Sequence, residues 1–134
     1  MVVRVATAAF VGIEARPVDV QVQIANGNVV FTVVGLGDKA VAESRERVRA
    51  ALNASGLAMP AKRITVNLAP ADLPKEGSHY DLPIALGIMA AIGAIPPDSL
   101  SNYTVLGELA LDGTITAVAG VLPAAIAANA RGHG

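Results

Sequence analysis

Hydrophobic and polar residues alternate with a two-residue period in several segments, which is the pattern of a strand with one buried face. The clearest case is residues 18–25, where every second residue is Val or Ile and the residues between them are mostly Asp or Gln. Residues 2–8 and 63–68 are predicted strands of the same kind. The pair Asn26-Gly27 is a strong hairpin signal because both residues tolerate positive φ, so residues 28–34 are predicted to return beside 18–25.

The segment 38–55 changes to the 3.6-residue period of an α-helix. The residues expected to face the sheet are Val41, Ser44, Val48, Ala51, Leu52 and Ser55. Away from that face, Glu43 and Arg47 are four residues apart in the order that favours an ion pair. We expect Asp38 to cap the start of this helix and Gly56 to cap its end.

Two further helices are predicted in the second half of the chain. Residues 81–92 are apolar on nearly all sides, which predicts a buried helix with Asp81 as its N-terminal cap. Residues 122–131 form the other helix, and Gly132 is placed to cap its end. Proline in the first turn of each supports both assignments, because the missing N–H costs little there.

A second hairpin, with strands 103–111 and 114–118 around Asp112-Gly113, completes the pattern. Strands and helices alternate without a repeat or a linker, which predicts one α/β (α+β) domain over residues 1–134. We expect a mixed sheet of about five strands with helices packed on it. The regular pattern also suggests that the chain is truncated from a longer protein, the alternative being a complete small domain.

Composition narrows the possible functions. Small aliphatic residues dominate the 53% of residues that are hydrophobic, and only 3% are aromatic, which suits helices packed closely on a sheet. A net charge of −1 gives no global attraction to nucleic acid or to a membrane surface. The absence of cysteine excludes disulfides and thiolate metal sites. No signal peptide is recognisable and the apolar stretch 82–97 is too short to span a bilayer, so we expect a cytoplasmic protein.

The segment 35–39, Gly-Leu-Gly-Asp-Lys, superficially resembles a phosphate-binding loop. A true loop of this kind has two glycines separated by four residues and followed by Lys and Ser or Thr. Here Lys39 follows at once and Ala40 stands where the hydroxyl is needed, so we interpret the segment as a tight turn before a helix.

The most polar cluster precedes the predicted buried helix. It consists of Lys75, Glu76, Gly77, Ser78, His79, Tyr80 and Asp81. Serine, histidine and aspartate are the residue types of a nucleophilic triad, and the helix start could hold an anion. Neighbours in one loop rarely reach triad geometry, which favours a structural loop and leaves its role as an interaction loop open.

Other candidate sites carry less chemistry. Only two histidines are present, His79 and His133, without a supporting ligand pattern, so we expect no metal site. The one concentration of basic residues consists of Arg45, Arg49, Lys62 and Arg63, with Arg45 and Arg49 on the same helix face. A solvated helix surface is one interpretation, and a patch for DNA or a partner protein is the other.

Several segments together resemble a known family. The longest run is residues 64–77, Ile-Thr-Val-Asn-Leu-Ala-Pro-Ala-Asp-Leu-Pro-Lys-Glu-Gly, with further likeness at 34–36, 43–52, 80–85 and 106–113. The chain resembles the N-terminal region of bacterial magnesium-chelatase-like AAA+ proteins of the YifB or ComM type. The likeness extends from about residue 4 to the end.

This resemblance implies a Lon-protease-like domain, related in fold to the second domain of a small ribosomal-subunit protein. In the longer family members the domain accompanies an AAA+ ATPase module, which would bind ATP and Mg²⁺, whereas no cofactor is expected in this chain. Family members of the ComM type are similar to hexameric branch-migration helicases that act on DNA in natural transformation. The implied partners are therefore the AAA+ module, sister subunits and, as an alternative, DNA, with no membrane partner.

The Lon likeness can be followed onto individual residues. Lon-type proteases use a serine nucleophile that a lysine activates. Matching the family loops to this sequence places His79 at the nucleophile position, with Ser78 one residue early, and Leu122 at the lysine position. An aliphatic side chain accepts no proton, so the resemblance implies a degenerate dyad and a non-catalytic domain. The alternative is a cryptic serine hydrolase in which Ser78 is paired with His79 or Lys75.

Overall fold

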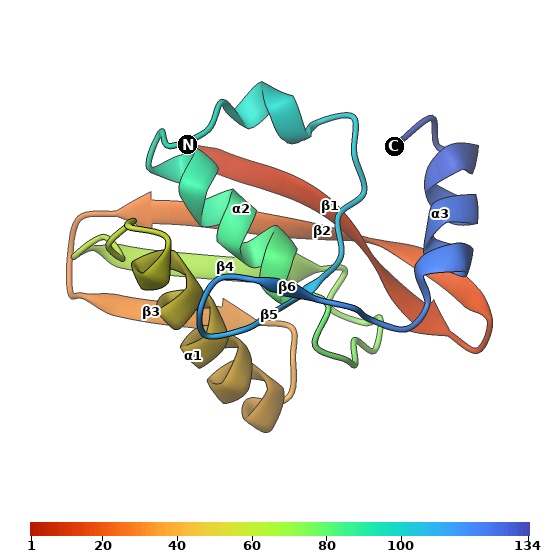
Figure 1. Ribbon diagram of the computed structural model, residues 1–134, viewed down its shortest axis with the longest axis horizontal. Helices are drawn as coiled ribbons and strands as arrows, with labels where there is room; N and C mark the ends of the chain where they lie inside the picture. Colours follow the sequence, from red (N-terminus) through yellow and green to blue (C-terminus); the bar gives the residue numbers. More distant parts are fainter.

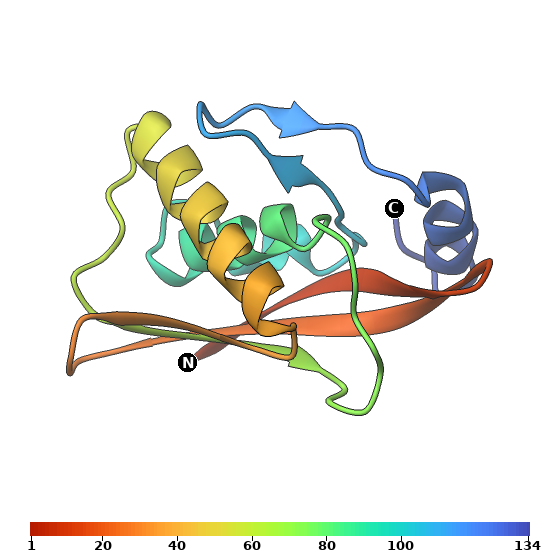
Figure 2. The same cartoon turned by 90° about the horizontal axis from the view of Figure 1, so that it is seen from below.

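The computed structural model describes residues 1–134 as a four-stranded sheet with all helices on one face (Figures 1 and 2). The elements in chain order are β1 (Val2–Val11), β2 (Glu14–Ala25), β3 (Val30–Val34), α1 (Asp38–Ala54), β4 (Arg63–Ala69), α2 (Asp81–Ala91), the 3₁₀ helix η1 (Pro97–Leu100), β5 (Glu108–Leu109), β6 (Ile115–Thr116) and α3 (Val121–Ala130). The α/β (α+β) class is confirmed. The main sheet has four strands, and β5 and β6 form a separate two-stranded ribbon where longer strands were predicted.

The strand order in the main sheet is β1-β2-β4-β3. β1 and β2 form an antiparallel hairpin, β4 is antiparallel to β2, and β3 is parallel to β4. The hairpin predicted at Asn26-Gly27 is therefore wrong, because β4 lies between β2 and β3. The actual hairpin turns at Gly12-Ile13, and Gly12 adopts a φ of +61°, which suits the first loop residue of a two-residue turn.

In the central part of the sheet, alternate residues point toward the helices and are buried. In β4 these residues are Ile64, Val66 and Leu68, as the alternation predicted. The residues between them are only partly buried, and in part they hydrogen-bond across the opposite face, as Asn67 does with Gln21. The core therefore lies between one face of the sheet and helices α1 and α2 (Figure 2).

Helix α1 buries Ser44, Val48, Ala51 and Leu52. The predicted C-terminal cap at Gly56 is confirmed, since the N–H groups of Gly56 and Leu57 return to carbonyls of the last helical turn. Three other expectations for this helix are wrong. Ser55 is exposed, the N-cap is Gly37 with Asp38 inside the first turn, and Arg47 forms its salt bridge with Asp81 in place of Glu43.

Helix α2 is buried on most of its surface, as its apolar sequence predicted. It crosses both β1 and β2. Close approach to the sheet requires Gly87, because a Cβ at this position would lie 2.6 Å from Cγ2 of Val22. No helix combines the length and the apolar character needed to cross a membrane.

The chain from α2 to its end returns along β1 and closes one end of the molecule. The Val105 N–H donates to the Ala6 carbonyl, so this segment covers the outer edge of β1. Helix α3 then packs against β2 beside the β1–β2 hairpin (Figure 1). Its end is capped at Gly132 as predicted, with the His133 N–H donating to the Ala128 carbonyl.

Candidate functional site

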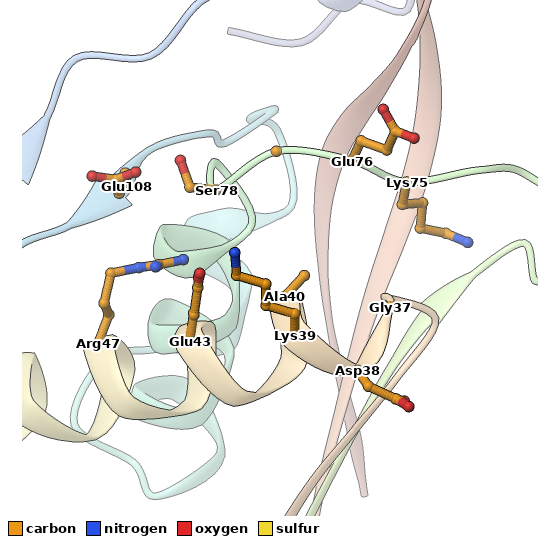
Figure 3. Close-up of a pocket in the computed structure, with 11 residues that line it drawn as sticks. Gly37, Asp38, Lys39, Ala40, Glu43, Arg47, Lys75, Glu76, Ser78 and Glu108 are labelled. Atoms are coloured by element: carbon orange, nitrogen blue, oxygen red, sulfur yellow. The ribbon is translucent and has the colours of Figure 1, made fainter.

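The polar loop before α2 forms one wall of a cleft of about 700 Å³ (Figure 3). The first turns of α1 form the opposite wall, and β5 closes one end. The lining residues are Gly37, Asp38, Lys39, Ala40, Glu43, Arg47, Lys75, Glu76, Gly77, Ser78 and Glu108. The structure thus brings the predicted interaction loop together with residues of α1 that are about 40 positions earlier in the chain.

Asp81 connects three elements beneath this cleft. Its fully buried carboxylate accepts hydrogen bonds from Ser44 Oγ at 2.7 Å, from two nitrogens of Arg47 at 2.5 and 3.1 Å, and from the Leu109 N–H at 3.1 Å. These bonds raise the pKa of Arg47, since the guanidinium is stabilised in its charged form. Asp81 therefore ties α1 and β5 to the start of α2, and the prediction that it caps α2 is wrong, because Tyr80 is the N-cap.

Ser78 lies at the mouth of the cleft without a partner that could activate it. Its side chain takes part in no hydrogen bond, and Figure 3 shows the Lys75 side chain directed away from it. The Lys75 ammonium donates to the carbonyls of Pro70 at 2.6 Å and Leu73 at 2.8 Å. Burial lowers the pKa of Lys75, but the amine is occupied in holding its own loop.

His79 is buried beneath the loop and serves the packing of β1. Its Nε2 lies 2.6 Å from the Ala8 carbonyl, which can only accept, so Nε2 carries the proton. The ring packs between Phe10 and Tyr80, with ring-centre distances of 5.2 and 4.0 Å. Burial lowers the pKa of His79, and together with Glu76 it raises the pKa of Tyr80 to about 12.

The segment matched to the Lon lysine lies beside the polar loop, yet the residue at the lysine position, Leu122, is exposed to solvent. Ala117, Val118 and Ala119 share a small cavity with residues 76–79. Leu122, at the expected base position, begins α3 and is 72% exposed. The two loops of the predicted dyad are thus neighbours, and no proton acceptor comes from the second one.

A model of the family described as subunit ChlI of Mg-chelatase matches residues 20–134, which is most of the chain. The chain belongs to this ChlI family. Competence protein ComM of Haemophilus influenzae is 50% identical over 121 residues, which cover 90% of this chain and 24% of that relative. Protein YifB of Salmonella typhimurium is 47% identical over 127 residues, covering 95% of this chain and 25% of the relative.

A Mycobacterium bovis relative is 42% identical over 129 residues, which cover 96% of this chain and 26% of the relative. These matches confirm the resemblance to YifB-type and ComM-type proteins. The ChlI-family chain spans about a quarter of the length of the curated relatives it matches.

The four basic residues singled out in the sequence gather near β3 in this ChlI-family fold. Arg45 donates to the Phe31 carbonyl at 3.0 Å, and Arg49 lies 6.0 Å from the centre of the Phe31 ring. Lys62 lines the same shallow groove as Arg49, and Arg63 is the register partner of Val30. Arg49 and Lys62 therefore share one groove, separate from the cleft that contains Ser78, whereas Arg63 alternates with the buried Ile64 and faces the opposite side of the sheet from α1.

The segment 35–39 forms a tight turn. Gly35 has a φ of +110°, and a Cβ there would lie 2.8 Å from the Leu68 carbonyl oxygen. This close approach to β4 explains the glycine without a phosphate.

Sequence reasoning missed Ser44, Arg47 and Glu108 as parts of the site. Ser44 left a signal, because it is a polar residue among the inward positions of α1. Arg47 was placed in a different ion pair, and Glu108 had no signal. No three His, Cys, Asp or Glu side chains lie together in the manner of metal ligands.

Proposed function

We propose that this chain is the non-catalytic, Lon-protease-like N-terminal domain of a magnesium-chelatase-like AAA+ protein of the ComM type. Its role is to bind the AAA+ module, sister subunits or a partner. The observation that carries this proposal is that Lys75, His79 and Asp81, the candidate bases of the loop around Ser78, are each held in a structural bond, and that the Ser78 side chain itself forms no hydrogen bond. ATP, Mg²⁺, hexamer formation and branch migration of DNA would belong to the longer protein.

Lys75, His79 and Asp81 each have a specific structural task. Lys75 closes the loop through two carbonyls, and His79 holds β1 through Ala8. Asp81 is saturated by its bonds to α1 and β5. A serine hydroxyl is a weak nucleophile unless an adjacent base takes its proton. Using any of these groups as a base would require breaking a buried bond, so the geometry supports a binding role for the cleft.

The charges that line the cleft also suit binding better than hydrolysis. Arg47 and Lys75 are engaged in bonds to Asp81 and to backbone carbonyls. The other charged residues in the lining are Asp38, Lys39, Glu43, Glu76 and Glu108, and none forms a salt bridge. An oxyanion would meet mostly carboxylates, which destabilise it.

A fluorophosphonate probe tests the alternative of a cryptic serine hydrolase. We expect no labelling of the folded chain, and no difference between the natural chain and Ser78→Ala, because the hydroxyl is not activated. Ser99→Ala, at another serine, is the matched control, and trypsin shows that the probe is active. Labelling that disappears in Ser78→Ala and persists in Ser99→Ala would overturn the proposal.

A further inference from the structure

β3 is an edge strand with an open side. It pairs only with β4, so the backbone groups on its other side have no strand partner (Figure 1). Arg45 donates to the Phe31 carbonyl, which is the one contact that a side chain makes with the β3 backbone. The other edge of the sheet is covered in its middle, where the carbonyls of Ala6 and Ala8 accept from the Val105 N–H and from His79 Nε2. An exposed edge of this kind is a template for one more strand.

A groove of about 220 Å³ lies at the beginning of this edge strand. Its apolar lining comes mainly from Val29, Phe31, Met59 and Pro60. Val29 is 71% exposed and Met59 and Pro60 are half-buried, whereas Phe31 is buried, so the lining is open to solvent mainly at Val29. An apolar side chain of a bound segment would be removed from water in this groove, which favours binding.

The charges at the groove are all positive. Arg49 and Lys62 line it, and no carboxylate does. Arg45 on α1 lies next to them and donates to the Phe31 carbonyl, so three basic residues lie on this side of the sheet. The nearest acidic contact is Glu46, 3.5 Å from Arg49. An acidic partner is complementary to this surface.

A protein segment fits these observations better than DNA. Arg45 already donates to a backbone carbonyl, and only Arg49 and Lys62 line the groove, which is few cations for a run of phosphates. Phosphates also gain nothing from an apolar lining or from an open strand edge. An extended segment uses all three features, through backbone hydrogen bonds, an apolar anchor and carboxylates.

We infer that β3 and its groove bind an extended acidic peptide segment with apolar anchor residues, which adds to the sheet as a fifth strand. This inference rests on the proposed role as a partner-binding domain and names the chemistry of the partner. The incoming strand pairs with the free side of β3. Its carboxylates lie against Arg49 and Lys62, and one apolar side chain enters the groove.

Selection from a random library of 12-residue peptides on the immobilised 134-residue chain provides the probe. We expect enrichment of peptides that contain several Asp or Glu residues together with Val, Ile or Leu. The most enriched peptide, labelled with fluorescein, is then measured by fluorescence anisotropy against the natural chain and two double variants. Arg49→Glu with Lys62→Glu reverses the groove charges, and Arg16→Glu with Arg131→Glu is the control of equal charge change at exposed sites elsewhere.

The groove variant should weaken binding at least tenfold, and the control less than twofold. Because a proline in β3 risks unfolding the sheet, the strand contact is measured on the natural chain by amide NMR shifts, which should be largest at residues 29–34. The inference is overturned by no acidic enrichment, by equal binding to both variants, or by shifts located elsewhere. It is also overturned if a 12-nucleotide DNA binds this surface more tightly than the peptide at the same salt concentration.

The two proposals fail separately. If peptide binding fails and Ser78 remains unlabelled by the fluorophosphonate, the groove assignment is lost and the non-catalytic assignment stands. If Ser78 is labelled, the non-catalytic assignment is lost, whatever the peptide does.

Discussion

At the scale of single residues, His79 shows how a catalytic residue type is used for packing. Its Nε2 proton belongs to the bond with Ala8, so Nδ1 carries a lone pair in the neutral ring. A Cβ at Gly77 would lie 2.9 Å from Nδ1, so glycine is what allows the loop to pass so close. Protonating Nδ1 would place a positive charge in a buried aromatic cluster, where Nδ1 has no hydrogen-bond partner.

This burial predicts a pH dependence of stability. Burial lowers the pKa of His79 below its ordinary value of 6.5, whereas the unfolded chain titrates near that value. As the pH falls below about 6.5, the unfolded state takes up a proton that the folded state does not, so the free energy of unfolding decreases until the lowered pKa is passed. His79→Gln, which can still donate to Ala8, should lose this dependence.

Urea unfolding between pH 7.5 and pH 5 measures this effect, in a range where most carboxylates stay charged. His133→Gln, at the other histidine, is the control and should keep the slope of the natural chain. If His79→Gln has the same slope as the natural chain, the ring is not held neutral in the fold.

At the scale of elements, the contact between α2 and β2 depends on the absence of a side chain at Gly87. Gly87→Ala places a Cβ 2.6 Å from Cγ2 of the fully buried Val22. Overpacking costs about 1–3 kcal/mol, and the higher helix propensity of alanine returns up to about 1 kcal/mol. We therefore expect a net loss on the order of 1–2 kcal/mol in the free energy of unfolding.

A double-mutant cycle identifies the cause of that loss. Val22→Ala removes the clashing methyl groups, so the double variant with Gly87→Ala should lose less stability than the sum of the two single losses. Gly37→Ala with Val22→Ala is the control pair: alanine is disfavoured at this N-cap, but a Cβ there meets nothing within 4 Å, so the two losses should add. Additive losses for Gly87→Ala and Val22→Ala in denaturant unfolding would show that α2 can move away from the sheet.

The elements themselves followed from local patterns, whereas their pairing did not. The two-residue period located β2 and β4, and the 3.6-residue period located α1. The turn signal at Asn26-Gly27 is local. It contains no information about β4, which begins nearly 40 residues further along the chain and pairs with β2 in place of β3. The hairpin at Gly12-Ile13 was missed because an apolar residue follows the glycine.

The same limit applies to the candidate site. The polar loop 75–81 was visible as residue types, and the loss of a base at Leu122 followed from the resemblance. The partners of this loop were not visible, because Ala8 and Ser44 lie more than 30 positions away in sequence. The caps predicted at Asp38 and Asp81 were both wrong. For Asp81 the reason is the same, because its carboxylate accepts hydrogen bonds from α1 and β5.

At the scale of the whole molecule, the extent of burial predicts that local stability differs between helices α2 and α3. Helix α2 buries seven residues against β1 and β2. Helix α3 buries only Ala124 and Ala128, packs mainly on β2, and leaves Val121, Leu122 and Ile126 exposed. Segments with few buried apolar contacts open locally at a lower free energy than the core.

Amide hydrogen exchange should therefore separate the two helices. We expect the α3 amides to exchange at least tenfold faster than those of α2, because local opening of α3 exposes little apolar surface. Ile126→Ser, at an exposed position, should leave both rates unchanged. Measurement at two protein concentrations separates the alternatives. Slow exchange of α3 that appears only at high concentration, and is lost in Ile126→Ser, would mean that copies of the chain cover its apolar face. Slow exchange of the α3 amides at both concentrations would contradict the predicted difference in local stability between α2 and α3.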